Sequence, residues 1–150
     1  MSNLKNKETG AGGKNTNKNG LSFEEKTNIN KILNIEHTKI KFDIGVNDYY
    51  TTFYVEDNPF IRLCKKGLIK YMKNKQIIND YPLEPDECIL DEKNECMYII
   101  EKKFQQGSGS ADEKIQTGLF KTILYSEHYP DYKVVYIYVL SNWFKQEKYN

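Results

Sequence analysis

The sequence predicts an α/β domain in which helices flank a mixed β-sheet. Two observations lead to this prediction. Residues 87–103 have the pattern of a β-hairpin, and residues 110–140 combine a capped helix with an unbroken apolar run. A hairpin that continues through a helix into a buried strand forms a parallel crossover. We therefore expect an antiparallel hairpin plus a parallel crossover strand in one sheet.

The hairpin and the crossover can be placed residue by residue. Strands are expected at 87–90 and 96–100, the second running into 101–103, because the intervening residues 91–94 are typical of a turn. After a break at 107–109, Ser110 begins a capping box, and the apolar residues of the next helix predict its buried face. Those residues are Ile115, Leu119 and Ile123. The apolar run 134–140 predicts a strand that is buried on both faces.

The first half of the chain predicts further elements. The capping box at 22–25 predicts a helix over 23–35, and the two-residue alternation at 40–44 predicts a strand. After a turn at 45–48, the aromatic and β-branched residues 50–55 predict another strand. Asn58-Pro59 predicts the start of a helix that ends before Gln76, since proline is tolerated at the first helical position.

Length and charge limit the domain organisation. The 150 residues fit one domain, which we place at 21–150 after a flexible basic arm at 1–20. The chain has 22 Lys+Arg and 21 Asp+Glu, so its net charge of +1 excludes steering of the whole molecule toward a polyanion. The 3 Cys and 2 His exclude a cysteine zinc site, a disulfide framework and histidine-rich metal chemistry.

Targeting signals are absent from the sequence pattern. No apolar run approaches the ~20 residues that a membrane helix needs, and the first ten residues lack the apolar segment of a signal peptide. We therefore expect a soluble, cytoplasmic protein with reduced thiols and no membrane partner.

Acidic and basic side chains gather on the predicted hairpin. Glu101 and Lys103 are two residues apart on one strand and so share a face, whereas Lys102 points to the other. Asp86 lies at the mouth of the partner strand. If the turn centres between residues 92 and 93, Asp86 lies opposite Ile99 and diagonal to Glu101; a shift by two residues places it opposite Glu101. Either register lets the two carboxylates converge beside an ammonium group.

That convergence predicts metal-dependent chemistry. Two carboxylates at the edge of an apolar face repel each other unless a cation neutralises them. Oxygen ligands without histidine or cysteine select a hard ion such as Mg²⁺ or Mn²⁺, and such an ion supports phosphodiester hydrolysis. The alternative is a solvent-facing ion pair between Glu101 and Lys103 with no catalytic role.

Pro85-Asp86, followed by Glu101-Lys102-Lys103, resembles the PD-(D/E)XK nuclease superfamily. The segment 99–114 is more closely similar to small type II restriction endonucleases of that superfamily. The resemblance implies a restriction-endonuclease-like core, Mg²⁺ that Mn²⁺ can replace, and double-stranded DNA as substrate. It implies metal ligation by Asp86, Glu101 and the backbone carbonyl of Lys102, catalysis by Lys103, and further roles for Glu24 and Gln116.

The resemblance also raises questions of partners and function. The family generally continues past the last strand, so we expect a C-terminally truncated or minimal copy. Symmetric duplex cleavage favours a homodimer, and a restriction role predicts a cognate DNA methyltransferase encoded nearby. Two alternatives stay open: a non-catalytic DNA-binding or interaction module on a nuclease-like scaffold, and a repair or junction nuclease.

Overall fold

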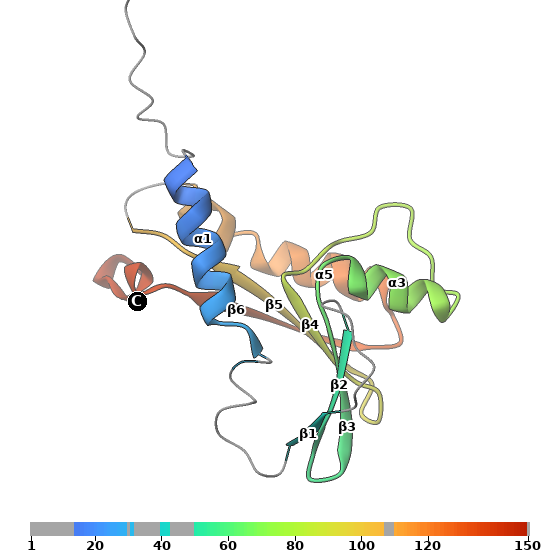
Figure 1. The fold of residues 1–150 in the computed structure, drawn as a ribbon. Coiled ribbons are helices and arrows are strands. Elements are labelled where there is room, and N and C mark those ends of the chain that lie inside the picture. Colours follow the sequence, from blue (N-terminus) through green and yellow to red (C-terminus); the bar gives the residue numbers. More distant parts are fainter. Residues whose placement is uncertain (1–13, 30, 32–39, 43–49, 107–109, 150) are drawn as a thin grey trace, which may run out of the picture.

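A computed structural model describes residues 14–29, 31, 40–42, 50–106 and 110–149. These residues form a six-stranded sheet with helices on both faces (Figure 1). The strands are β1 (Ile40–Phe42), β2 (Tyr50–Val55), β3 (Asn58–Leu63), β4 (Glu87–Asp91), β5 (Cys96–Lys103) and β6 (Lys133–Leu140). The helices are α1 (Lys14–Lys26), α3 (Lys66–Asn74), α4 (Ala111–Ile115) and α5 (Gly118–His128), followed by short 3₁₀ turns η1 (Asn142–Lys145) and η2 (Glu147–Tyr149).

The predicted mixed sheet is confirmed. Strands β1 to β5 form an antiparallel meander in chain order, and β6 pairs with β5 in parallel. The β4–β5 hairpin aligns Glu87 with Ile100 and Asp91 with Cys96. The crossover through α4 and α5 then places Leu140 beside Lys103. The carboxyl ends of β5 and β6 therefore meet at one end of the sheet.

The two faces of β5 have different environments. Met97 and Ile99 are fully buried in an apolar core that α3 and α5 cover with Leu68, Met72 and Tyr125, among others. The opposite face lies under α1, where the buried Lys102 side chain donates from Nζ to the backbone oxygen of Glu24 at 3.3 Å. Figure 1 shows α1 on one face of the sheet and α3 with α5 on the other.

The predictions for the amino-terminal region are wrong in part. Residues 14–20 belong to α1 and not to a flexible arm, and this helix ends at Lys26 where we predicted it to continue to 35. Ser22 consequently lies inside the helix and is not its cap. The chain is helical again at residues 29 and 31. Residues 1–13, 32–39 and the predicted turn 45–48 lie outside the described residues.

The helix predicted from Asn58-Pro59 is also wrong. Asn58–Leu63 forms strand β3, which pairs with β2 through a two-residue turn at Glu56 and Asp57. Both turn residues have positive φ, 50° and 67°. The helix of this region, α3, begins only at Lys66. Its buried residues Leu68 and Met72 lie within the range predicted to be helical, which ended before Gln76.

The crossover helix and the last strand differ from prediction in their burial. The helix is divided into α4 and α5, and Leu119 and Ile123 are 76% and 48% exposed, where we predicted a buried face. Strand β6 was predicted to be buried on both faces, but it is the edge of the described sheet and Ile137 and Leu140 are exposed.

Two predictions from composition can be compared with the fold. All three cysteines, Cys64, Cys88 and Cys96, are free thiols. Among the described residues, no helix has the length and apolar character needed to cross a membrane.

Candidate active site

The site begins where β4 starts and β5 is about to end. The pairing of Glu87 with Ile100, extended by one residue, places Asp86 opposite Glu101. This is the second of the two registers that the sequence allowed; the one that aligned Asp86 with Ile99 is wrong, because Ile99 pairs with Cys88. Asp86 directly precedes β4, and the charge of Glu101 on β5 acts on its carboxyl group, so the two acids lie at the same end of the hairpin.

The backbone of β5 holds Asp86 in position. Its Oδ2 accepts a hydrogen bond from the backbone N–H of Lys102 at 2.7 Å. On the other side of β5, toward β6, the backbone carbonyl of Lys103 accepts a hydrogen bond from the backbone N–H of Ser141 at 3.0 Å. Since successive residues of a strand direct their backbone groups to alternate neighbours, the carbonyl of Lys102 faces the Asp86 side. Two carboxylates and one carbonyl thus share this corner.

Two ammonium groups contact Glu101. Lys103 Nζ lies 2.6 Å from Glu101 Oε1, as expected for residues on one face of a strand. Lys121 Nζ, from α5, lies 3.2 Å from the same oxygen and 6.0 Å from the ring centre of Tyr136. The sequence prediction missed Lys121. Lys121 and Tyr125 are four residues apart and lie on the buried side of α5, which is the pattern that could have indicated this contact. The prediction used the more apolar residues Leu119 and Ile123, which lie on the exposed side.

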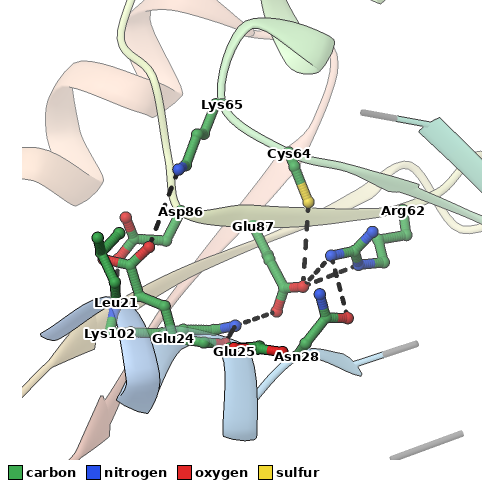
Figure 2. A pocket seen from close by; sticks show the side chains of 10 residues that line it. All are labelled: Leu21, Glu24, Glu25, Asn28, Arg62, Cys64, Lys65, Asp86, Glu87 and Lys102. Atoms are coloured by element: carbon green, nitrogen blue, oxygen red, sulfur yellow. Dashed lines mark hydrogen bonds and ion pairs between the residues drawn. The ribbon is translucent and has the colours of Figure 1, made fainter. Parts of the chain in front are cut away.

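Glu24 reaches the site from α1. Figure 2 shows its carboxylate beside that of Asp86, with the Lys65 side chain directed toward it. Lys65 Nζ is 3.9 Å from Glu24 Oε2. Burial and the neighbouring charge of Asp86 raise the pKa of Glu24 above its usual value. Lys65 precedes α3 and was predicted to lie inside a helix, so the sequence did not indicate this contact.

The carboxyl of Asp86 carries unfavourable electrostatic energy. Burial raises its pKa, and the charge of Glu101 adds to the effect, while the hydrogen bond from Lys102 N–H opposes it. The neighbours that raise the pKa of Asp86 and Glu24 are other carboxylates of the same corner. A cation placed there would relieve this repulsion.

The raised pKa of Asp86, caused first by burial and then by the charge of Glu101, predicts that Asp86→Asn stabilises the fold. An acid whose pKa is raised on folding stabilises the protein only while protonated, so stability falls as pH rises through the raised pKa. At neutral pH without divalent ions, we expect the variant to gain roughly 1 kcal/mol in unfolding free energy, after allowance for solvent screening. Thermal unfolding in EDTA measures the gain. Mg²⁺ should then stabilise the wild type and leave the variant unchanged; equal shifts in both would contradict a metal role for Asp86.

A buried ion network lies next to the site on the α1 face. Glu87 is 2% exposed and accepts from Arg62 Nε at 2.8 Å, while its other oxygen lies 2.9 Å from Lys102 Nζ. These residues line a polar cavity of about 340 Å³ that also contains Glu24, Asp86 and Cys64 (Figure 2). Burial raises the pKa of the Cys64 thiol to about 11, so this cysteine is not a nucleophile at neutral pH.

The structure therefore brings together most of the predicted site residues. Asp86, Glu101, Lys103 and the backbone of Lys102 meet, and Glu24 joins them from α1. Gln116 is exposed at the end of α4, and no contact among the described residues joins it to the site. Over the described part of the chain, no three His, Cys, Asp or Glu side chains form a ready-made metal cage.

No family model matches the chain. Neither the curated proteins nor the solved structures contain a match to it. The function must therefore be inferred from the site itself.

Proposed function

We propose that this protein is a metal-dependent endonuclease that hydrolyses DNA phosphodiester bonds. One observation carries the proposal: Asp86, which directly precedes β4, lies near enough to Glu101 of β5 for the Glu101 charge to raise its pKa, and the ammonium group of Lys103 contacts Glu101 at 2.6 Å. A purely structural ion pair would account for Glu101 and Lys103. It would not account for the position of Asp86 beside two further acids: the charge of Glu101 raises the pKa of Asp86, and the charge of Asp86 raises that of Glu24.

The donor set fits a hard divalent cation. Carboxylate oxygens of Asp86 and Glu101, with the carbonyl oxygen of Lys102, are the ligands that Mg²⁺ prefers, and Mn²⁺ accepts the same set. Two carboxylates leave room for water and for a substrate phosphate. When bound, the ion would supply a nucleophilic water and neutralise charge on the phosphate. Burial, and after it the charge of Glu101, raises the pKa of Asp86, and a bound cation would offset both effects.

The lysines supply the remaining chemistry. Lys103 would hydrogen-bond the attacking water and stabilise the negative charge that develops on the phosphate. Lys121 adds a second positive charge at the same oxygen of Glu101. Glu24 approaches from α1, where it would orient water or contact a second ion. The acids alone would repel a polyanionic substrate such as DNA. The positive charges of Lys103 and Lys121 would offset that repulsion.

The proposal extends to the family and the biological role. The mixed sheet with a parallel crossover supports a restriction-endonuclease-like core, and the spacing of Asp86, Glu101 and Lys103 supports the PD-(D/E)XK superfamily. A type II restriction enzyme is the role that the sequence resemblance favours, with duplex DNA as substrate.

Plasmid cleavage tests the proposed function. Purified protein should cut supercoiled DNA with Mg²⁺ or Mn²⁺, and EDTA should stop the reaction. Fixed fragments from linear duplex would support a restriction role, whereas preferential cutting of flaps or branches would support repair. DNA binding without metal, together with no cleavage under any divalent ion, would reject the nuclease in favour of a non-catalytic DNA-binding module.

Lys121 should separate metal binding from catalysis. Lys121→Ala removes a cation 3.2 Å from Glu101 Oε1, so Mg²⁺ should bind more tightly to the variant. The same change removes positive charge near the phosphate, so the rate at saturating Mg²⁺ should fall about tenfold. A Mg²⁺ titration of the cleavage rate measures both effects. Lys114→Ala, an exposed lysine of α4, is the control; a rate loss with unchanged Mg²⁺ dependence would contradict this role.

A further inference from the structure

A second pocket lies beside the candidate active site at the carboxyl ends of β5 and β6. It has a volume of about 750 Å³. Its walls come from three segments: α1, the residues that follow β5 and the residues that follow β6. It is lined by Phe23, Phe104, Gln105, Gln106, Leu140, Ser141, Asn142, Trp143 and Gln146. None of these side chains carries a charge.

The lining combines aromatic rings with side-chain amides. Phe23 and Phe104 pack with ring centres 5.6 Å apart, and Trp143 adds a third aromatic ring to the walls. Glutamine and asparagine offer both hydrogen-bond donors and acceptors. A planar, uncharged heteroaromatic group with donors and acceptors on its edge matches this combination, because it can stack on the rings and pair with the amides.

The walls of the pocket are held in place by contacts within the chain. Ser141 Oγ accepts from the backbone N–H of Gln105 at 3.0 Å and donates to the Gln105 carbonyl at 2.9 Å, which joins the two loops. Trp143 Nε1 donates to the Tyr149 hydroxyl at 3.2 Å, and Gln146 Nε2 donates to the Trp143 carbonyl at 2.9 Å. Because these contacts preorganise the pocket, its side chains and loops lose little conformational entropy when a ligand binds.

The position of the pocket favours one kind of heteroaromatic group. Phe104 directly follows Lys103, and Phe23 directly precedes Glu24, so two pocket rings adjoin two residues of the candidate active site. We infer that this pocket binds a nucleobase of the DNA strand whose phosphate lies at Asp86 and Glu101. The inference rests on the proposed nuclease function for the identity of that strand.

A base in this pocket must leave the duplex. A stacked and paired base exposes only its edge in a groove, whereas stacking on Phe104 or Trp143 requires a free face. The protein therefore takes an unpaired or extrahelical base next to the cleavage position. Mismatched, single-stranded or easily unstacked positions supply such a base at the lowest energetic cost.

Trp143 makes the pocket directly observable, because it is the only tryptophan in the chain. Its fluorescence is titrated with a short single-stranded oligonucleotide in EDTA, where cleavage cannot occur. A matched oligonucleotide with an abasic site at its centre and otherwise the same phosphates is titrated in parallel. We expect the intact strand to quench Trp143 and to bind about tenfold more tightly than the abasic strand.

Variants then localise the binding. Gln106→Ala combined with Gln146→Ala changes two exposed amides of the pocket and should weaken binding of the intact strand about tenfold without affecting the abasic strand. Asn74→Ala, an exposed amide on α3, is the control and should bind like the wild type. Equal affinity for the two oligonucleotides, or no quenching by either, would overturn the inference.

The outcome is separable from that of the nuclease proposal. Base-dependent quenching in EDTA, with no cleavage under any divalent ion, would reject the nuclease and retain the base pocket. Metal-dependent cleavage without base-dependent quenching would retain the nuclease and reject the pocket.

Discussion

Replacing Lys103 with alanine is expected to reduce Mg²⁺-dependent DNA cleavage by about a thousandfold and to leave the fold intact. The loss follows from the position of the ammonium group, 2.6 Å from the carboxylate that is proposed to bind the metal. The fold should survive because Lys121 still neutralises Glu101 and because the side chain of Lys103 is outside the apolar core. Single-turnover cleavage measures the rate, and circular dichroism with thermal unfolding measures the fold.

Lys133→Ala provides the matched control for this experiment. Lys133 is an exposed lysine at the opposite end of the parallel β5–β6 pair, beside Cys96. Its loss changes the net charge by the same amount without touching the site. If Lys103→Ala cuts DNA at the wild-type rate, the proposed assignment fails. If Lys103→Ala and Lys133→Ala lose activity equally, the loss comes from the change in net charge and not from a catalytic role of Lys103.

The hairpin was predictable because its information is local. Turn-forming residues at 91–94 join two strand-forming segments, and the two-residue period then determines which side chains share a face with Glu101. The exact pairing register of β4 and β5 was not predictable, because the sequence at 91–94 is compatible with turns of different length and geometry. That difference decided whether Asp86 lies diagonal to Glu101 or directly opposite it.

The β2–β3 hairpin was missed because its turn lacks the usual residues. Two-residue hairpin turns with positive φ at both positions normally contain glycine or asparagine. Here Glu56 and Asp57 adopt φ of 50° and 67°. The following Asn58-Pro59 then resembles a helix start, although Pro59 lies in β3 opposite Tyr54. Pairing with β2 on one side and with β4 on the other outweighs the local preference.

The helices near the site were misjudged for a different reason. Apolar spacing on α5 indicated Leu119 and Ile123, yet α5 turns Lys121 and Tyr125 toward the sheet. Tertiary contacts with Glu101 and the apolar core select that face. The composition of residues 14–20 does not explain why α1 begins as early as Lys14. From Phe23 onward, packing on Phe104 accounts for its position.

Glu87→Ala is expected to lower the free energy of unfolding by about 3–5 kcal/mol, a large fraction of the stability of an ordinary domain. The side chain of Glu87 is 2% exposed and lies between Arg62 and Lys102, which are 4% and 3% exposed. Removing the carboxylate leaves two buried positive charges without their negative partner. Chemical denaturation measures the loss. Glu25→Ala removes one partner of the exposed ion pair with Lys31 and should leave the denaturation midpoint unchanged.

The same network connects stability to the active site, which gives this prediction a second measurable consequence. Glu87 Oε1 also accepts from the backbone N–H of Ile29 at 3.4 Å, and Lys102 Nζ donates to the backbone oxygen of Glu24. Loss of Glu87 therefore loosens α1 from the sheet and, with it, the carboxylate that α1 carries into the site. Replacing Arg62, Glu87 and Lys102 together by apolar residues removes the unpaired charges, so the triple variant should be more stable than Glu87→Ala. If Glu87→Ala instead unfolds within about 1 kcal/mol of the wild type, water must reach the two cations, and the network does not hold α1 in place.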